Sequence, residues 1–191
     1  MDDIKSKYKN LFTGVGKFEN KYCIKVKNDV NPVIHPPRKV PLALKEKLKL
    51  ELEKMTKEGI IAPVEEATDW VSSLVLVDKP NKLRICMDSR DLNNAIKRPH
   101  HPLPVIEDVI SDLGNAKIFT VLDVKNGFWH VELTEESSYL TTFNSPFGRF
   151  RWLRLPFGIN AASEEFQRRM NEVIEGLDGV KVIIDDLLVY G

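Results

Sequence analysis

The sequence predicts an α+β domain in which an antiparallel β-sheet carries helices packed on one face. Two kinds of periodicity indicate this class. Several short segments alternate apolar and polar residues, as half-buried strands do, and longer segments repeat apolar residues every three or four positions, as amphipathic helices do. The 191 residues are 42% hydrophobic and 29% charged, a composition typical of a globular domain with one substantial core.

The N-terminal part predicts a strand, an extended connector and a helix. Residues 22–26 alternate apolar and polar side chains, as expected of a half-buried strand. Four prolines within residues 32–41 favour an extended connector. Apolar residues spaced along one helical face across residues 44–55 then predict a helix, with Pro41 near its start and Gly59 as its stop.

A hairpin and a shorter helix are expected next. Residues 71–77 and 82–87 have the composition of two paired strands, and the turn between them falls at Pro80 and Asn81. Apolar residues at helical spacing across residues 105–113 predict a short helix after this hairpin.

The C-terminal part predicts further strands around a turn, followed by a longer helix. Residues 128–133 and 150–155 alternate as strands do, and residues 146–148 are expected to turn the chain before the second of them. Asn160 is the expected N-cap of a helix whose apolar face extends to Leu177.

An apolar run interrupted by two carboxylates closes the sequence. Residues 182–190 are rich in β-branched side chains except at Asp185 and Asp186, and a strand this apolar is expected to be buried on both faces. Two ionised aspartates inside it would cost several kcal/mol each unless a cation or a tight turn receives them. We therefore expect a β-hairpin with the pair at its tip. Asp123 similarly ends the apolar segment 118–123.

Three carboxylates on two strand ends match the ligands of a two-metal site for phosphoryl transfer. Such sites hold two Mg²⁺ ions about 3.5–4 Å apart through hard oxygen ligands. The alternative is an ordinary exposed turn, because Asp is a favoured turn residue. The joint order of strand, Asp, long intervening unit, strand and Asp-Asp favours the metal site.

The charge is balanced overall but divided along the chain. Residues 1–104 contain 20 Lys and Arg against 14 Asp and Glu, whereas residues 105–191 contain 8 against 14. This division suits a protein that neutralises phosphate on one side and holds metal on the other, although a chance imbalance on solvated faces is the alternative. Because no run approaches the roughly 20 apolar residues of a membrane helix, no membrane partner is expected.

Several motifs fall in one order along nearly the whole chain, from about residue 11 to residue 191. The ordered set resembles the reverse transcriptase domain of the Ty3/gypsy class of LTR retrotransposons, encoded within Pol polyproteins, and is far more specific than any single motif. The motifs are Trp70-Val71-Ser72-Ser73, Leu83–Asn93, Pro102-Leu103-Pro104, Leu122–Phe128, Phe143–Gly148, Leu155–Ile159, Phe166–Met170 and Ile184-Asp185-Asp186.

The resemblance implies the fingers and palm of a right-hand polymerase. Residues 1–40 would be an N-terminal extension and proline-rich connector, residues 41–121 mainly fingers, and residues 122–191 mainly palm with the catalytic hairpin. The implied activity is RNA-directed DNA synthesis, in which two Mg²⁺ ions, or Mn²⁺, assist attack of a primer 3′-hydroxyl on a dNTP. The implied partners are an RNA or DNA template with its primer. The thumb and RNase H parts of the polyprotein are expected to lie outside this chain, and the implied location is intracellular, in the cytoplasm, a virus-like particle or the nucleus.

The same resemblance implies roles for individual residues. Asp123, Asp185 and Asp186 would be the catalytic, metal-binding residues, with the carbonyl of Val124 as a further ligand. Phe128 would lie under the sugar of the incoming nucleotide and exclude a 2′-hydroxyl.

Four further residues are candidates for contact with the nucleotide. Arg84 matches the fingers arginine on the triphosphate, a contact for which a guanidinium is well shaped, and Phe157 would pack near the nucleotide. Either Lys79 or Lys82 would meet phosphate. The structural alternatives are a salt-bridged surface arginine for Arg84 and core aromatic residues for Phe128 and Phe157.

The sequence also departs from the family pattern. Ile183 stands where the family usually has Tyr, and the turn around Pro80 is one residue shorter than usual. These departures leave a second function open, in which a decayed or host-retained copy binds nucleic acid or a protein partner without catalysis.

Overall fold

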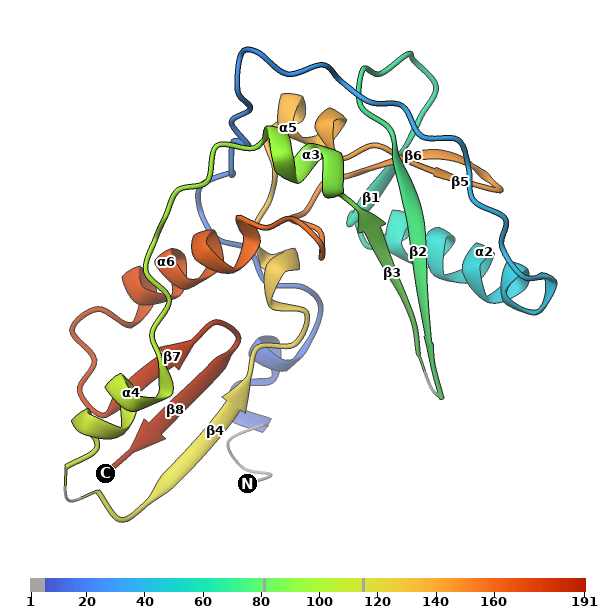
Figure 1. Ribbon diagram of the computed structural model, residues 1–191. Helices are drawn as coiled ribbons and strands as arrows, with labels where there is room; N and C mark the ends of the chain where they lie inside the picture. Colours follow the sequence, from blue (N-terminus) through green and yellow to red (C-terminus); the bar gives the residue numbers. More distant parts are fainter. Residues whose placement is uncertain (1–5, 81, 115) are drawn as a thin grey trace.

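The computed structural model describes residues 6–80, 82–114 and 116–191. Short groups of strands and short groups of helices follow one another along the chain (Figure 1). In chain order the elements are η1 (Lys9–Phe12), α2 (Leu42–Lys57), β1 (Ile61–Val64), β2 (Ser72–Lys79), β3 (Lys82–Asp88), α3 (Arg90–Ala95), α4 (Ile106–Asp112), β4 (Phe119–Asp123), η2 (Gly127–His130), α5 (Glu135–Leu140), β5 (Phe143–Ser145), β6 (Gly148–Trp152), α6 (Ala162–Ile174), β7 (Val180–Ile183) and β8 (Asp186–Tyr190).

The strands form two sheets (Figure 1). One has the order β1-β6-β5-β2-β3, and the other has the order β4-β8-β7. In the larger sheet β2 and β5 run parallel, while the other neighbouring pairs are antiparallel. The predicted α+β class is confirmed. The sheet itself differs from the prediction, because the strands divide into two sheets and one pair is parallel.

Local signals account for α2. Pro41 is its N-cap, and Gly59 follows its end with a φ of +67°, the left-handed conformation that suits glycine. Leu48, Leu52 and Met55 form its buried face, four and three residues apart. The predicted helix is confirmed in extent and in the face that it buries.

The strand predicted for residues 22–26 is wrong. The segment makes only two isolated bridges among the described residues, Tyr22 to Leu133 and Val26 to Ile96. Because its two ends pair with different parts of the chain, no continuous ladder can form. Its alternating pattern therefore reflects contact with the core at separate points.

The strand predicted for residues 128–133 is also wrong at its start. Asn126 has a φ of +54°, and the Trp129 amide donates to the Asn126 carbonyl at 2.8 Å, so the chain turns into η2. This turn buries Trp129 and leaves the neighbouring Phe128 half-buried. Tertiary packing has overridden the alternating pattern here.

The helix beginnings show two further differences from prediction. The N-cap of α6 is Ala161; the side-chain amide of Asn160 instead donates to the Asn93 carbonyl at 3.3 Å. Helix α5 was not predicted, although Thr134 caps it by accepting a hydrogen bond from the Ser137 amide. Within the described ranges, none of the helices is long and apolar enough to span a bilayer.

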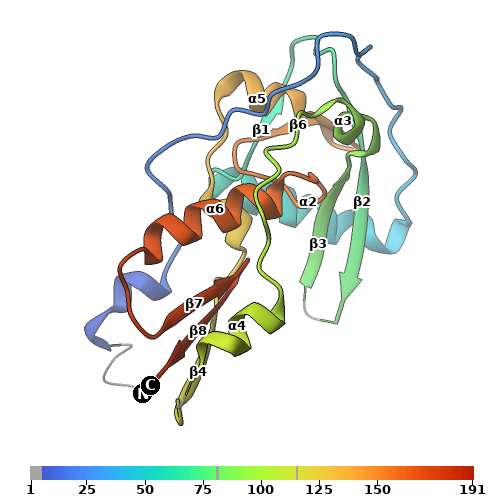
Figure 2. The same cartoon turned by 60° about the vertical axis from the view of Figure 1, so that its left-hand side comes forward.

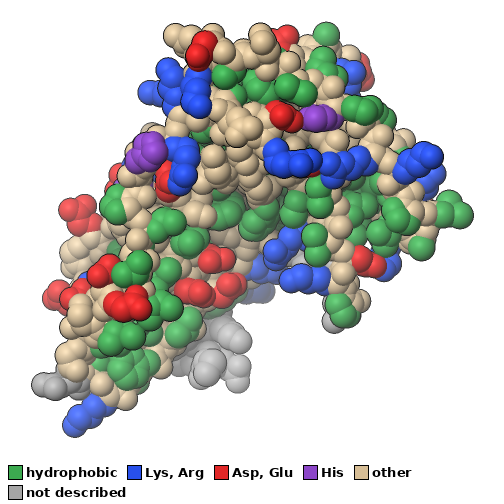
Figure 3. Space-filling model, in the orientation of Figure 1, with side chains coloured by type: hydrophobic (Ala, Val, Ile, Leu, Met, Phe, Trp, Pro, Cys, Tyr) green, Lys and Arg blue, Asp and Glu red, His purple; other side chains and the backbone are tan. Residues whose placement is uncertain are grey.

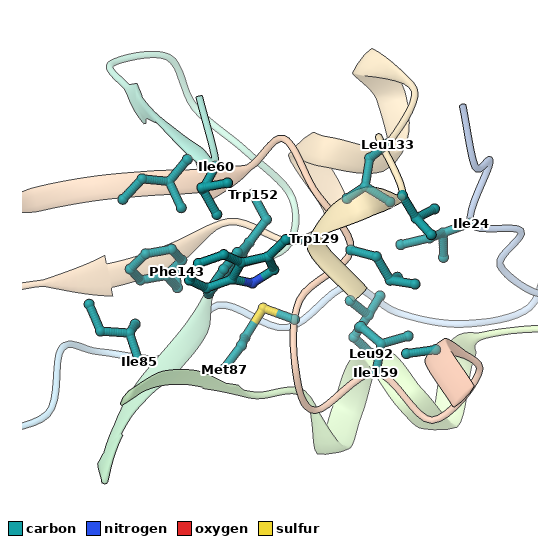
Figure 4. Packing of buried hydrophobic residues seen from close by; sticks show 14 of the residues in the cluster. Ile24, Ile60, Ile85, Met87, Leu92, Trp129, Leu133, Phe143, Trp152 and Ile159 are labelled. Carbon is teal, nitrogen blue, oxygen red and sulfur yellow. The ribbon is translucent and has the colours of Figure 1, made fainter. Parts of the chain in front are cut away.

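The main core lies between the larger sheet and the helices, and tryptophans occupy its centre (Figure 4). Trp129 reaches in from η2 and Trp152 from β6, with their ring centroids 6.4 Å apart. Phe143 packs 5.8 Å from Trp152, and Met87 lies beside the same cluster. Because η2 is anchored in this core, the residues immediately before and after Trp129 are held in fixed positions.

The smaller sheet is much more open. Helix α6 lies along β7, while β4 forms the opposite edge and is exposed at every position (Figures 1 and 2). The prediction that residues 182–190 are buried on both faces is therefore wrong: Val182 is buried, but Asp186 and Val189 are exposed. A three-stranded sheet with an uncovered edge strand cannot enclose its outer side chains.

Candidate functional site

The β7–β8 hairpin carries two of the predicted aspartates. Its last strand pair is Ile183 with Asp186, so the two-residue turn consists of Ile184 and Asp185. The predicted hairpin is confirmed, but its tip lies one residue earlier than expected, because Asp186 already belongs to β8. Ile184 has a φ of +54°, and a left-handed conformation costs a residue other than glycine about 1–3 kcal/mol.

The backbone brings Asp123 to the same place. Asp123 lies directly opposite Asp186 in the β4–β8 register, and such facing residues have Cβ atoms about 4.5–5.5 Å apart. The amide of Val124 donates to the carbonyl of Asp185 at 2.7 Å, which ties the end of β4 to the hairpin turn. The three aspartates therefore share one end of the smaller sheet.

The donor atoms at this end suit a hard divalent cation. Three carboxylates and the Val124 carbonyl are oxygen ligands of the kind that Mg²⁺ and Mn²⁺ prefer. The side chains as they stand do not form a metal-ligating group, since among the described residues no three His, Cys, Asp or Glu are so arranged. Asp123 and Asp186 are exposed, so their carboxylates can rotate without unpacking the core.

An aromatic cluster lies next to this sheet end. Phe128 packs against Phe157 at 5.2 Å and against Phe166 at 5.6 Å between ring centroids. Gly127 provides the link to the hairpin, because a Cβ there would lie 2.9 Å from Phe166 Cζ and 3.4 Å from Asp185 Cβ. The chain thus places the ring of Phe128 close to the aspartates, and both Phe128 and Phe157 remain half-buried.

Arg84 extends the cluster toward the larger sheet. Its guanidinium lies 5.2 Å from the centroid of the Phe157 ring, within the range of a cation–π interaction. Arg84 stands on β3 opposite Val77 of β2. The structure therefore brings together Arg84, Phe157 and Phe128, three of the residues predicted to contact the nucleotide. The side chain of Lys82, the other residue predicted on β3, lies outside the described residues.

A groove of about 930 Å³ lies near Arg84. Leu83, the residue before Arg84, lines it, and so does Lys79, one of the two lysines predicted to meet phosphate. Its remaining cations were not predicted, because they come from segments far apart in the sequence that only the fold brings together. Three are partly neutralised, since Lys47 pairs with Asp78 at 3.3 Å, Lys54 with Glu51 at 3.5 Å and Arg154 with Glu132 at 3.3 Å. The cations lining the groove are Lys47, Lys54, Lys79, Lys125 and Arg154.

Charge is distributed unevenly around this region (Figure 3). Acidic side chains gather over the turn end of β7 and β8, and basic side chains lie across the recess toward β2 and β3. At the end of β3, a hydrogen bond from Arg90, with a second from Arg38, lowers the pKa of Asp88. Asp88 holds both arginines beside the end of β3.

The loop that presents Phe157 is held by a close backbone approach at Gly158. Its carbonyl accepts hydrogen bonds from Ser89 Oγ at 2.5 Å and from Asn93 Nδ2 at 2.8 Å. Gly158 has a φ of +110°, and a Cβ there would lie 2.7 Å from the Met87 carbonyl oxygen. Glycine is therefore required at this position by both conformation and space.

Replacing Gly158 by Ala should reduce the free energy of unfolding for two reasons, the strained backbone conformation and the close contact of the new Cβ with Met87. The contact should add about 1–3 kcal/mol to the loss caused by the strain. Gly148 provides the matched control, because it has a φ of +112° but a Cβ there would meet nothing within 4 Å. Denaturant unfolding of Gly158→Ala and Gly148→Ala separates the two effects. Equal losses would mean that the contact between Gly158 and Met87 is not tight.

The chain is similar to known proteins over the region that contains this site. A family model described as reverse transcriptase (RNA-dependent DNA polymerase) matches residues 77–191. An uncharacterized protein of Caenorhabditis elegans is 34% identical, and the match covers 95% of this chain and 15% of that protein.

Two transposon proteins of Drosophila melanogaster are also similar. The retrovirus-related Pol polyprotein from transposon 412 is 34% identical over 90% of this chain and 14% of its own length. The corresponding polyprotein from transposon gypsy is 34% identical over 73% of this chain and 14% of its own length. The chain spans 15% or less of each of these three relatives.

A solved structure shares the fold. The foamy viral protease–reverse transcriptase in complex with an RNA/DNA hybrid superimposes with a TM-score of 0.86, covering 98% of this chain and 26% of that one. The two sequences are 20% identical, so the likeness concerns the fold alone.

Proposed function

Because this chain belongs to the reverse transcriptase family, we propose that it carries the nucleotidyl-transfer site of an RNA-directed DNA polymerase of a Ty3/gypsy-type retrotransposon. One observation carries the proposal. The end of the smaller sheet joins Asp123, Asp185 and Asp186 through the β4–β8 register and the Val124 hydrogen bond. The fingers-and-palm fold expected from the motifs agrees with the foamy viral likeness.

In the proposed reaction, a bond forms between the primer 3′-oxygen and the α-phosphorus of a dNTP. The bond from that phosphorus to the β-phosphate oxygen breaks, pyrophosphate leaves, and the hydroxyl proton passes to solvent. Asp123, Asp185 and Asp186, with the Val124 carbonyl, would hold two divalent cations. When bound, these cations supply Lewis-acid stabilisation of the attacking and leaving oxygens.

The neighbouring residues would bind and orient the nucleotide. Arg84, whose guanidinium lies beside the ring of Phe157, would donate hydrogen bonds to the triphosphate. Lys79 and Lys125 line the neighbouring groove and would add positive charge. Phe128 would form the wall beneath the sugar, supported from behind by Phe166.

The proposed substrates are a primed RNA or DNA template and dNTPs. The foamy viral structure is a complex with an RNA/DNA hybrid, and the transposon relatives are Pol polyproteins, which supports a template–primer as partner. The basic groove and Arg84 support a triphosphate beside it.

Primer extension tests the proposal directly. The chain, incubated with Mg²⁺, dTTP and oligo(dT) annealed to poly(rA), should add at least one nucleotide, and EDTA should abolish the addition. Binding of the primed template without any addition, in Mg²⁺ or in Mn²⁺, would contradict the proposal and favour the non-catalytic binding function instead.

A further inference from the structure

Gln167 is a fully buried polar residue that reaches the tip of the β7–β8 hairpin. It lies on α6 with no exposed surface. Its Oε1 accepts a hydrogen bond from the Ile184 amide at 2.7 Å, and its Nε2 donates to the Val182 carbonyl at 3.1 Å. A second bond from Nε2, to Asn171 Oδ1 at 2.8 Å, fixes the orientation of the amide.

Gln167 binds Ile184, the residue of the hairpin turn that has a strained backbone conformation. Ile184 has a φ of +54°, which a β-branched side chain adopts only where its surroundings impose it. Two contacts flank this conformation. Gln167 holds the amide of Ile184 from the α6 side, and the Val124 amide holds the carbonyl of Asp185 from the β4 side. The turn is therefore clamped from both sides.

The clamp determines where the carboxylates stand. Asp185 and Asp186 directly follow Ile184, so the φ of Ile184 sets the direction in which the chain enters β8. If Ile184 relaxed to a negative φ, the turn would change type, and the direction in which Asp185 and Asp186 leave the turn would change with it. Among the described residues, Gln167 is the side chain that accepts a hydrogen bond from the Ile184 backbone amide.

We propose that Gln167 is a positioning residue of the proposed polymerase site, acting through the backbone of Ile184 to keep Asp185 and Asp186 beside Asp123. It does not contact a substrate or a cation. The part of this inference that concerns metal binding rests on the proposed function, whereas the clamp on the turn does not.

Gln167→Met tests the clamp, because methionine has similar length and removes all three hydrogen bonds. Hydrogen exchange should show the Ile184 amide exchanging at least about tenfold faster, while amides of β2 and β3 keep their rates. The Mn²⁺ dissociation constant, measured by electron paramagnetic resonance, should rise about 10–100-fold, the usual effect of removing a group that orients metal ligands.

A second substitution separates positioning from simple destabilisation. Glycine adopts a positive φ without strain, so the turn of Ile184→Gly needs no clamp. In the Gln167→Met background, Ile184→Gly should restore Mn²⁺ affinity to within a few-fold of the value for Ile184→Gly alone. A residue that merely fills the core would not be rescued by a change in the turn.

Leu52→Ala provides the matched control for stability, because Leu52 is buried in α2, which contacts β1 and β3. It should lower the melting temperature while leaving Ile184 exchange and Mn²⁺ affinity unchanged. Unchanged protection of the Ile184 amide in Gln167→Met, or a double variant no better than the single one, would overturn the inference. If the wild-type chain bound no Mn²⁺, that result would contradict the proposed function but not the clamp. The exchange rate of the Ile184 amide would still test whether Gln167 holds the turn.

Discussion

Replacing Asp185 by Asn should reduce Mg²⁺-dependent primer extension about a thousandfold. The substitution keeps the size of the side chain but removes the negative charge that a divalent cation requires. Loss of metal-derived stabilisation of the transition state amounts to several kcal/mol, and each 1.4 kcal/mol corresponds to about a factor of ten in rate. Because the Asp185 carbonyl that binds Val124 belongs to the backbone, the hairpin itself should stay folded.

Asp178→Asn is the matched control for that experiment. Asp178 is exposed in the segment before β7, away from the turn, so the same chemical change there should leave the rate within about twofold. The measurement is single-nucleotide addition under saturating dTTP. An Asp185→Asn chain that retains more than a tenth of the wild-type rate would contradict the proposed role of this carboxylate.

Replacing Phe128 by Ala should let the chain accept ribonucleotides. If the ring lies under the sugar, it occupies the volume that a 2′-hydroxyl needs, and its removal opens that volume. Pockets of this kind discriminate between substrates differing by one small group by about 10–200-fold, so the preference for dTTP over UTP should fall by a factor in that range. The ratio of kcat/KM for the two nucleotides is the quantity to compare.

Phe128→Tyr controls for the packing that the ring provides. Tyrosine keeps the ring against Phe157 and Phe166, so discrimination should remain as in the wild type. Thermal unfolding of both variants shows how much stability the aromatic cluster contributes. Unchanged discrimination in Phe128→Ala would mean that Phe128 is a core aromatic residue and not the wall of a sugar site.

The sequence predicted best those elements whose signals are local. Helix α2 has its start at Pro41, its stop at Gly59 and a regular apolar face, so each boundary is determined within a few residues. The β7–β8 hairpin was predicted because two charges cannot remain inside an apolar strand. The end of β4 at Asp123 followed from the same reasoning.

The sequence predicted poorly what depends on distant contacts. Residues 128–133 alternate like a strand, yet burial of Trp129 in the core turns their first half into η2. The parallel pairing of Ser72 with Phe143 joins segments 71 residues apart and has no local signal. The division into two sheets follows from such pairings and could not be predicted.

The site shows the same distinction. The aspartates, Phe128 and Arg84 were found because they lie in motifs of recognisable order. The groove cations come from segments as distant as Lys47 and Arg154, so no pattern connects them. Gln167 offered one signal, a polar residue beside the buried positions of an amphipathic helix, and such residues need a partner that only the fold reveals.

Anomalous diffraction from crystals soaked in MnCl₂ tests most directly whether the three aspartates form a two-metal site. We expect two Mn²⁺ peaks about 3.5–4 Å apart at the end of β4 and the β7–β8 turn, with carboxylate oxygens of Asp123, Asp185 and Asp186 as ligands. Peaks elsewhere on the chain, with none at this sheet end, would contradict the proposed polymerase site.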